Sequence, residues 1–249
     1  MNQRTKNLAM AAVCALIIIV VAVAGYNIIG QPTLKRIFQM LGGNMPGGII
    51  QFLTYLAFFW GMFEISSRFY KVKEEQSSFD MELLPEQEQW VLSPDDVNDL
   101  KIKMIEKEKE QSLLMVGIIK KAATKFRANK SISDVIEIVS TQVKINMTKS
   151  ENAQSLIRYL AWAIPSIGFI GTILGIAESL GYADQASEPE GLAQVTAAMY
   201  VAFDTTLISL ILSIIIMYFI HSLQEQEDEL HMHMEEYVIE NLVNRIHIE

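Results

Sequence analysis

The 249-residue sequence contains few of the residues from which the active sites of soluble enzymes are most often built. Its only cysteine is Cys14, so an intramolecular disulfide is excluded. Neither a phosphate-binding loop nor a nucleophile elbow is present. The four histidines are confined to the last 29 residues, at His221, His231, His233 and His247. We therefore expect a protein that is not an enzyme and that holds no cofactor.

Charged residues are also scarce. They make up 20% of the chain against 51% for hydrophobic residues, and the apolar residues gather in long runs, a pattern typical of membrane proteins. A helix needs roughly 20 apolar residues to cross the hydrocarbon core of a bilayer. Four runs approach this length, at residues 8–30, 47–66, 156–182 and 196–221. The sequence therefore predicts an all-α polytopic membrane protein with four transmembrane helices, extended by a cytoplasmic helical bundle.

These runs divide the chain into four predicted parts. Residues 1–66 form an N-terminal transmembrane hairpin, and residues 67–155 form a cytoplasmic helical region. Residues 156–222 form a second transmembrane hairpin, and an acidic cytoplasmic helix follows at residues 223–249.

Basic residues near the helix ends predict the orientation, because such residues are retained on the cytoplasmic side. The loop at residues 181–196 carries three acidic residues and no Lys or Arg, so it is expected on the outer side. Lys35 and Arg36 lie in the other outer loop and are exceptions to the rule. Both termini are therefore expected in the cytoplasm. The basic residues at the cytoplasmic ends are Arg4, Lys6, Arg68, Lys71 and Lys73.

The cytoplasmic region has no surface suited to nucleic acid, because its 15 acidic residues nearly balance its 14 basic residues. Pro94 followed by two aspartates predicts a helix start. A second helix is expected within residues 111–129. Ser131 is expected to cap a third helix, whose apolar residues recur at three and four positions.

The acidic tail carries an apolar stripe close to heptad spacing, which implies a partner helix. His231 and His233 are two positions apart, so on a helix they point about 200° apart, and no metal site is expected. The stripe consists of Leu223, Leu230, Met234, Val238, Leu242 and Ile246.

Small and weakly polar residues form one face of the third predicted membrane helix and one face of the fourth. Side chains three and four positions apart share a helix face. Gly171 and Gly175 also form a Gly-xxx-Gly pair, which lets two helices approach closely in lipid. The first stripe consists of Gly168, Thr172, Gly175 and Ser179, and the second of Ala198, Ala202, Thr206, Ser209 and Ser213.

Thr172 and Thr206 are expected at the same depth. Each lies ten residues from the predicted outer edge, or roughly 15 Å at 1.5 Å per residue, close to the midplane of the bilayer. Hydroxyls at this depth can solvate a proton or a sodium ion, or bind a carboxyl group of another helix. The alternative is that each hydroxyl bonds to the carbonyl four residues earlier in its own helix.

Asp204, Thr205 and Ser209 are the other polar residues near this depth, and with Thr172 and Thr206 they are expected to line the ion pathway. An aspartate inside a membrane helix is expected to be neutral, paired or in contact with water. Asp204 is therefore either a group that titrates during transport or, if the helix begins later, a hydrated residue near the headgroups. Pro165 frees a carbonyl in the third helix and permits a kink there.

The third helix carries a recognisable motif. The run G-F-I-G-T-I-L-G-I at residues 168–176 resembles the signature of the MotA/TolQ/ExbB proton-channel family. Residues 202–210 resemble the family's next membrane helix, with Thr206 as the central threonine, although Ser209 stands where glycine is usual. Asp204 also departs from the family pattern. The resemblance covers about residues 155–222.

The resemblance implies a ring subunit of an ion-driven motor in the bacterial inner membrane. Five copies would surround two copies of a single-span partner of the MotB/TolR/ExbD type, whose membrane aspartate carries the ion, H⁺ in preference to Na⁺. Thr172 and Thr206 would face that aspartate. The resemblance does not distinguish flagellar rotation, gliding, outer-membrane energisation and defence as the work performed.

Two alternatives come from other functional classes. A secondary transporter would bind its substrate through Asp204 and need no single-span partner. A structural scaffold would use the acidic tail to bind a cytoplasmic partner, and would tolerate loss of the hydroxyls of Thr172 and Thr206.

Overall fold

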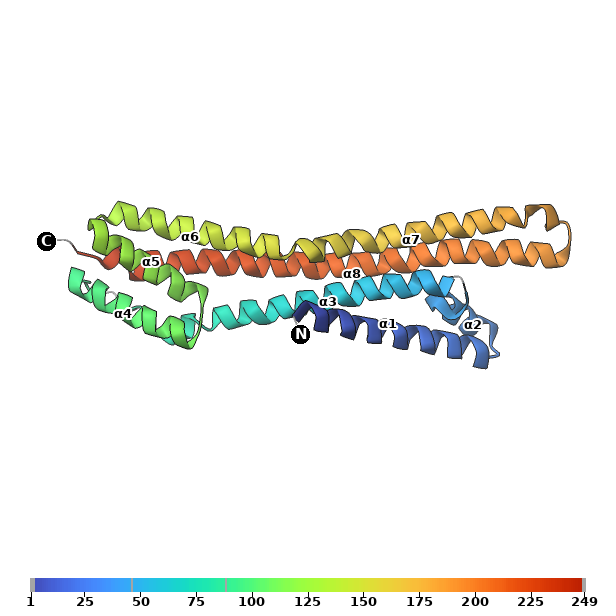
Figure 1. The fold of residues 1–249 in the computed structure, drawn as a ribbon, viewed down its shortest axis with the longest axis horizontal. Coiled ribbons are helices and arrows are strands. Elements are labelled where there is room, and N and C mark those ends of the chain that lie inside the picture. The colour runs from blue at the N-terminus through green and yellow to red at the C-terminus, as the bar shows by residue number, and fades with distance from the viewer. Residues whose placement is uncertain (1–2, 46, 88, 248–249) are drawn as a thin grey trace. The chain divides into compact units, whose positions relative to one another are not determined.

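The computed structural model describes residues 3–45, 47–87 and 89–247, and these residues are almost entirely helical (Figure 1). Four of the helices are long and apolar enough to cross a membrane, which confirms the predicted all-α polytopic fold. Within the described residues, the only β-type pairing is a bridge between Leu92 and Ile246. The helices are α1 (Gln3–Ile28), α2 (Pro32–Phe38), α3 (Gly47–Gln76), α4 (Pro94–Glu110), α5 (Leu114–Asn129), α6 (Ile132–Ala153), α7 (Ser155–Gly181) and α8 (Pro189–Asn241).

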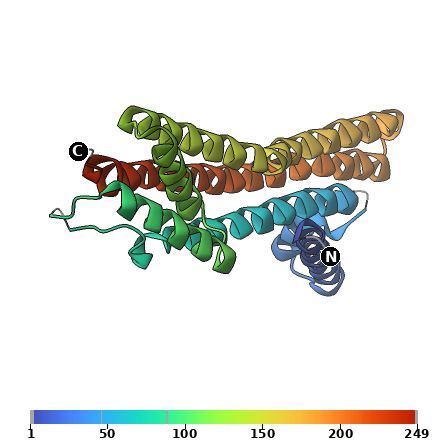
Figure 2. The ribbon, with the colours of Figure 1, turned by 60° about the vertical axis from the view of Figure 1, so that its left-hand side comes forward.

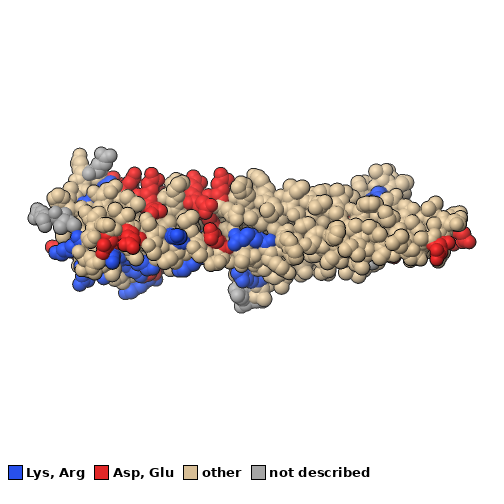
Figure 3. Space-filling view, turned by 90° about the horizontal axis from the view of Figure 1, so that it is seen from above, with Lys and Arg blue, Asp and Glu red and all other residues tan. Residues whose placement is uncertain are grey.

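The chain forms two compact units. The first, which we call the membrane unit, contains residues 1–67 and 155–221. The second, which we call the polar unit, contains residues 68–154 and 222–249. On the face shown in Figure 3, charged side chains gather over the polar unit and are sparse over the membrane unit. Helices α3 and α8 contribute residues to both units, whereas the break between α6 and α7 coincides with a boundary between the units.

The core of the membrane unit joins its two hairpins. Ala15 of α1, Tyr55 of α3 and Ile208 of α8 form a buried apolar cluster, surrounded by partly buried hydrophobic residues. Asn7, about two turns before Ala15 on α1, is buried and donates hydrogen bonds to Glu64 Oε1 at 3.0 Å and to the hydroxyl of Ser67 at 3.3 Å. Apolar packing and this polar contact therefore hold α1 against α3.

The connection between α1 and α3 folds back onto the hairpin. It contains α2 and a turn of π-helix at Gln39–Gly43. Gly42 has φ of +101°, a conformation that L side chains rarely adopt. A Cβ there would also lie 3.0 Å from the Cβ of Gln51. A glycine at this position therefore permits the turn that leads from the π-helical segment toward α3.

Two membrane helices extend well beyond the predicted apolar runs. Helix α3 continues to Gln76, because the charged residues after its apolar part are good helix formers. Helix α8 begins at Pro189, seven residues before the expected start, since proline suits the first turn and Glu190 favours the positive end of the helix. It then continues to Asn241, so the acidic tail is no separate helix. The end of the predicted tail, residues 248–249, lies outside the described residues.

The polar unit contains the predicted cytoplasmic helices. Ser93 forms a capping box with Asp96 at the start of α4, and the Ser131 side chain accepts a hydrogen bond from the backbone N–H of Asp134 at the start of α6. Both sequence-based helix starts are therefore confirmed. The apolar stripe of the tail is buried within this unit, where Ser140 of α6 donates a hydrogen bond to Glu235 at 2.5 Å. Figures 1 and 2 show α6 beside the second half of α8, so the implied partner helix belongs to the same chain.

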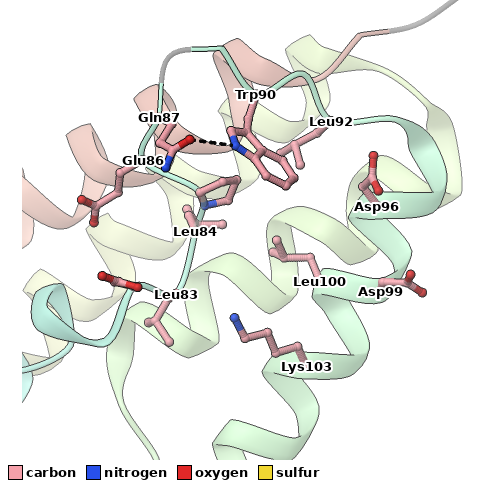
Figure 4. A pocket seen from close by; sticks show the side chains of 12 residues that line it. Leu83, Leu84, Glu86, Gln87, Trp90, Leu92, Asp96, Asp99, Leu100 and Lys103 are labelled. Carbon is pink, nitrogen blue, oxygen red and sulfur yellow. Dashed lines mark hydrogen bonds between the residues drawn. The ribbon is translucent and has the colours of Figure 1, made fainter.

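The polar unit also has an open cavity of about 640 Å³ between α4 and the segment that precedes it (Figure 4). Trp90 lines it and donates a hydrogen bond from Nε1 to Gln87 Oε1 at 3.2 Å. Carboxylates, among them Asp96 and Asp99, line the cavity with a single lysine, Lys103. None of the residues predicted to handle an ion lies among its lining residues.

Candidate functional site

Helices α7 and α8 run side by side through the membrane unit (Figures 1 and 2) and approach each other closely along a line of glycines. A Cβ added to Gly175 would lie 2.6 Å from the backbone nitrogen of Ala202 and 2.7 Å from the carbonyl oxygen of Ala198. A Cβ on Gly171 would lie 2.7 Å from the Cβ of Thr205. These separations leave no room for a side chain, so the predicted stripes of small residues form the contact between the two helices.

Thr172 and Thr206 meet across this contact. Their hydroxyl oxygens are hydrogen-bonded to each other. The Thr172 hydroxyl also lies 3.1 Å from the carbonyl oxygen of Ala202, and the Thr206 hydroxyl lies 3.1 Å from that of Gly168. Each hydroxyl has one proton, so one threonine donates to the other and the second donates to a carbonyl of the opposite helix. The sequence had placed these two residues at one depth, and the structure brings them together.

Thr205, the neighbour of Thr206, shows the alternative expected from the sequence, in which the hydroxyl bonds within its own helix. Thr205 donates to the carbonyl oxygen of Val201, four residues earlier, at 2.9 Å, and it is buried. Ser209 is fully buried and donates to the carbonyl oxygen of Thr206 at 2.9 Å. The Ser209 side chain packs against Gly168, and the Thr205 side chain packs against Gly171. In contrast, the Thr172 and Thr206 side chains are half-buried and retain exposed surface.

Asp204 forms an ion pair with Arg36 of α2. The two guanidinium nitrogens of Arg36 lie 2.5 and 2.6 Å from the two carboxylate oxygens of Asp204, a bidentate arrangement. The guanidinium also lies 4.0 Å from the ring centre of Tyr200, one helical turn before Asp204. The Asp204 side chain is only 7% exposed, whereas that of Arg36 is 35% exposed. Of the states expected from the sequence, the structure therefore shows the paired one.

Gln51 of α3 supports the same contact. Its side-chain nitrogen lies 2.9 Å from the carbonyl oxygen of Met40 and 3.3 Å from that of Asp204, so one amide group contacts both the π-helical turn and α8. The sequence analysis had not selected Arg36, Tyr200 or Gln51. One signal was present, because Arg36 is an unexplained basic residue in an outer loop and Asp204 is an unexplained acidic residue in a membrane helix.

The remaining residues predicted from the sequence lie away from the threonine pair. Ser179 is buried and donates to the carbonyl oxygen of Val195 at 3.4 Å, which joins the ends of α7 and α8 near their connecting loop. Pro165 lies inside α7, where it leaves the carbonyl of Ala161 without its helical N–H partner. Ser213 is half-buried on α8, 11 residues after Ala202 and farther from the threonine pair. Among the described residues, no group of three or more His, Cys, Asp or Glu side chains is placed to hold a metal ion.

Fold and site together define a multi-pass α-helical membrane protein with a hydroxyl pair between two closely packed spans. A sequence model described as the MotA/TolQ/ExbB proton channel family matches residues 107–236, which is more than half of the chain. The chain belongs to the MotA/TolQ/ExbB proton channel family. This match extends beyond both ends of the segment that resembled the family by motif. Comparison with curated proteins gave no match, and comparison with solved structures gave none either.

Proposed function

We propose that this chain is the ring subunit of an ion-driven motor complex in the bacterial inner membrane, with both termini in the cytoplasm. Five copies surround two copies of a single-span partner of the MotB/TolR/ExbD type. A membrane aspartate of the partner carries the ion, H⁺ in preference to Na⁺, past the α7–α8 hairpin of each subunit. Membership of the family supports the ring and its partner.

The observation that carries this proposal is the hydrogen-bonded pair of Thr172 and Thr206. Each hydroxyl both donates and accepts hydrogen bonds. The pair can therefore break its hydrogen bond with a backbone carbonyl and form a new contact with an approaching carboxyl group or ion. The backbone carbonyls of Gly168 and Ala202 remain as acceptors when this happens. The pair therefore gives a passing ion a polar contact within the membrane. Because the pair carries no charge, it does not hold the ion tightly, and the ion can leave again.

The position of the pair on α8 supports the same proposal. Asp204 points toward α2, where Arg36 binds it. Thr206 lies two residues later and is rotated by about 200° around the helix axis, so its hydroxyl lies on the opposite side. That side carries exposed apolar residues, such as Phe203 and Leu210. A partner helix has access to the threonines there, and the first hairpin does not stand between them.

The energy available is sufficient for mechanical work. One charge that crosses a potential of 100 mV releases roughly 2.3 kcal/mol, so a few ions per step can move packed helices past one another. In this proposal Thr172 and Thr206 contact the ion or its carrier. Asp204, Thr205 and Ser209 lie behind them and hold the hairpin in shape.

Two measurements test the proposal. The chain is expressed with its candidate single-span neighbour, and native mass spectrometry of the purified complex is expected to give five subunits to two. A stable monomer, or a dimer that forms without the partner, would contradict the ring. Ion flux is then measured in vesicles for Thr172→Ala and Thr206→Ala, with Thr196→Ala as a matched control, because Thr196 is an exposed α8 hydroxyl bonded to its own helix at Leu192.

The transporter and scaffold alternatives predict other results. A transporter that binds its substrate at Asp204 needs that carboxylate free, but Arg36 occupies both of its oxygens. It would retain flux without the single-span partner. A scaffold would show no flux at all, and the two threonine variants would assemble and function as the parent chain does.

A further inference from the structure

The polar unit contains a buried histidine with one free ring nitrogen. Only 2% of the surface of His231 is exposed. Its Nδ1 lies 2.6 Å from the carbonyl oxygen of Glu227. A carbonyl oxygen only accepts, so Nδ1 carries a hydrogen and donates it. Nε2 is buried and has no hydrogen-bond partner within the described part of the chain. The hydrogen-bonding capacity of this nitrogen, as an acceptor or, once protonated, as a donor, is therefore unused among the described residues.

His231 lines a cavity of about 180 Å³ that is formed within the polar unit by α3, the start of α5, α6 and α8. Three basic side chains also line this cavity, Arg68 and Lys71 from α3 and Lys149 from α6. None of the three forms an ion pair with another residue among those that the structure describes. Asn146 adds a donor, because its side-chain oxygen already accepts from Gln142 at 2.9 Å and its NH₂ group remains.

Two carboxylates line the same cavity, and both are engaged by donors. Glu75 accepts a hydrogen bond from the backbone N–H of Leu114 at 2.8 Å. Glu227 accepts one from the side chain of Gln154 at 2.6 Å. The three basic side chains therefore outnumber the carboxylates, and the carboxylates are held by neutral partners. The lining has an excess of positive charge beside a buried nitrogen that can accept a proton.

We propose that this cavity binds a phosphate-type anion, either free inorganic phosphate or the phosphate of a lipid headgroup. Lys149, Lys71 and Arg68 supply the positive charge, and His231 supplies a charge-assisted hydrogen bond from protonated Nε2. Binding of the anion is thus coupled to uptake of a proton by His231. Arg68 directly follows the membrane unit along α3, which makes lipid headgroups one of the two sources. The site is separate from the threonine pair and does not depend on the motor proposal.

The charged groups around His231 come from three helices. Those that line the two cavities beside it are Arg68, Lys71 and Glu75 of α3, Lys149 and Glu151 of α6, and Glu227 and Asp228 of α8. A proton on His231 therefore meets carboxylates as well as cations. A bound anion favours the protonated form of His231, because it adds negative charge on the side where the basic residues gather.

Calorimetric titration of the purified full-length chain with sulfate tests the proposal first. Sulfate resembles phosphate in shape and charge but does not itself titrate near neutral pH, so any change of affinity with pH reports on the protein. We expect sulfate to bind more tightly at about pH 6 than at about pH 8, by about fivefold, because proton uptake coupled to anion binding is favoured at the lower pH. Equal affinity at the two pH values would overturn the role of His231.

Three variants locate the site. Lys149→Met is expected to weaken sulfate binding by about fivefold, since it removes one charged partner of the anion. Lys144→Met is the matched control, because Lys144 is another exposed lysine of α6 and does not line the cavity; its affinity is expected to match the parent chain. His231→Gln keeps a polar side chain and is expected to abolish the pH dependence. Equal binding by Lys149→Met and Lys144→Met would overturn the assignment of the cavity.

A second experiment distinguishes the two sources of phosphate. The parent chain and Lys149→Met are mixed with phosphatidylglycerol or with inorganic phosphate, and adducts are counted by native mass spectrometry. More phosphatidylglycerol adducts on the parent chain identify a lipid headgroup, and more phosphate adducts identify the free anion. Absence of sulfate, phosphate and phosphatidylglycerol binding would overturn the proposal. Flux through the threonine pair is measured separately, so the two proposals fail independently.

Discussion

Asp204 and Thr206 are two residues apart on α8, yet their side chains make contacts on opposite sides of the helix. The carboxylate of Asp204 binds Arg36 in the first hairpin, while the hydroxyl of Thr206 binds Thr172 in α7. The ion pair of Asp204 and the neutral hydroxyl pair of Thr206 are thus on different sides of α8, although they lie within one helical turn. Substitutions at the two positions are therefore expected to have different consequences.

Removal of either partner of the ion pair is expected to destabilise the membrane unit. Arg36→Met leaves a buried carboxylate, and Asp204→Asn leaves a guanidinium without its counter-charge. We expect a loss of about 1–3 kcal/mol for each, less than for a fully buried pair because Arg36 is partly hydrated. The double variant is expected to lose less than the sum. Denaturant unfolding in detergent measures this cycle, and strictly additive losses would show that the pair is not coupled.

A change of Thr206 to serine keeps the hydroxyl, and a change to valine keeps the shape. Thr206→Ser is expected to retain ion flux within about twofold, whereas Thr206→Val is expected to reduce it by about tenfold, the equivalent of about 1.4 kcal/mol in the barrier. Vesicle flux assays with the partner present measure both. Equal flux in the two variants would mean that the hydroxyl takes no part in conduction.

The glycine contact predicts a steric effect. Gly171→Ala places a methyl group against Thr205 and is expected to destabilise the chain by about 1–3 kcal/mol. Gly181→Ala is the control within the same hairpin, because no heavy atom lies within 4 Å of a Cβ at that position. Thermal unfolding of both variants in detergent compares them. A similar midpoint for the two variants would argue against a close contact of α7 and α8 in solution.

The capping box of α4 predicts a dependence on pH. Hydrogen bonds from the hydroxyl and the backbone N–H of Ser93 lower the pKa of Asp96. The ionised form therefore stabilises the start of α4 above the ordinary aspartate pKa, and this contribution is lost as the pH falls through the lowered value. Hydrogen exchange of the first turn of α4 is expected to speed up in that acidic range. In Ser93→Ala the loss is expected at higher pH, and an unchanged profile would contradict the role of the cap.

Much of the fold follows from the sequence because hydropathy and helix periodicity are strong signals over 20 residues. The four spans and the caps at Ser93 and Ser131 depend on local chemistry, and all were predicted. The start of α8 at Pro189 and the extension of α3 to Gln76 were not, since the residues there are too polar for a hydropathy argument although they favour helix.

The candidate site also contains one contact that could be predicted from the sequence and one that could not. Thr172 and Thr206 could be placed together because they lie equally far from the facing ends of two antiparallel apolar runs, at residues 156–182 and 196–221. The contact of Asp204 with Arg36 could not be placed this way. It joins residues 168 positions apart and depends on the path of the connection between α1 and α3, which includes a turn with a positive φ at Gly42. Composition and periodicity carry no information on such a turn.

The fit of α7 against α8 has a consequence for motion. Along Gly168, Gly171 and Gly175 the contact is made by backbone and by the short side chains of the neighbouring helix, with no long side chain that could change rotamer to take up a shift. A slide of one helix along the other would drive Thr205 or Ser209 into the α7 backbone. We therefore expect the two helices to move together, so that in the proposed motor any rearrangement occurs at the outer surface of this hairpin.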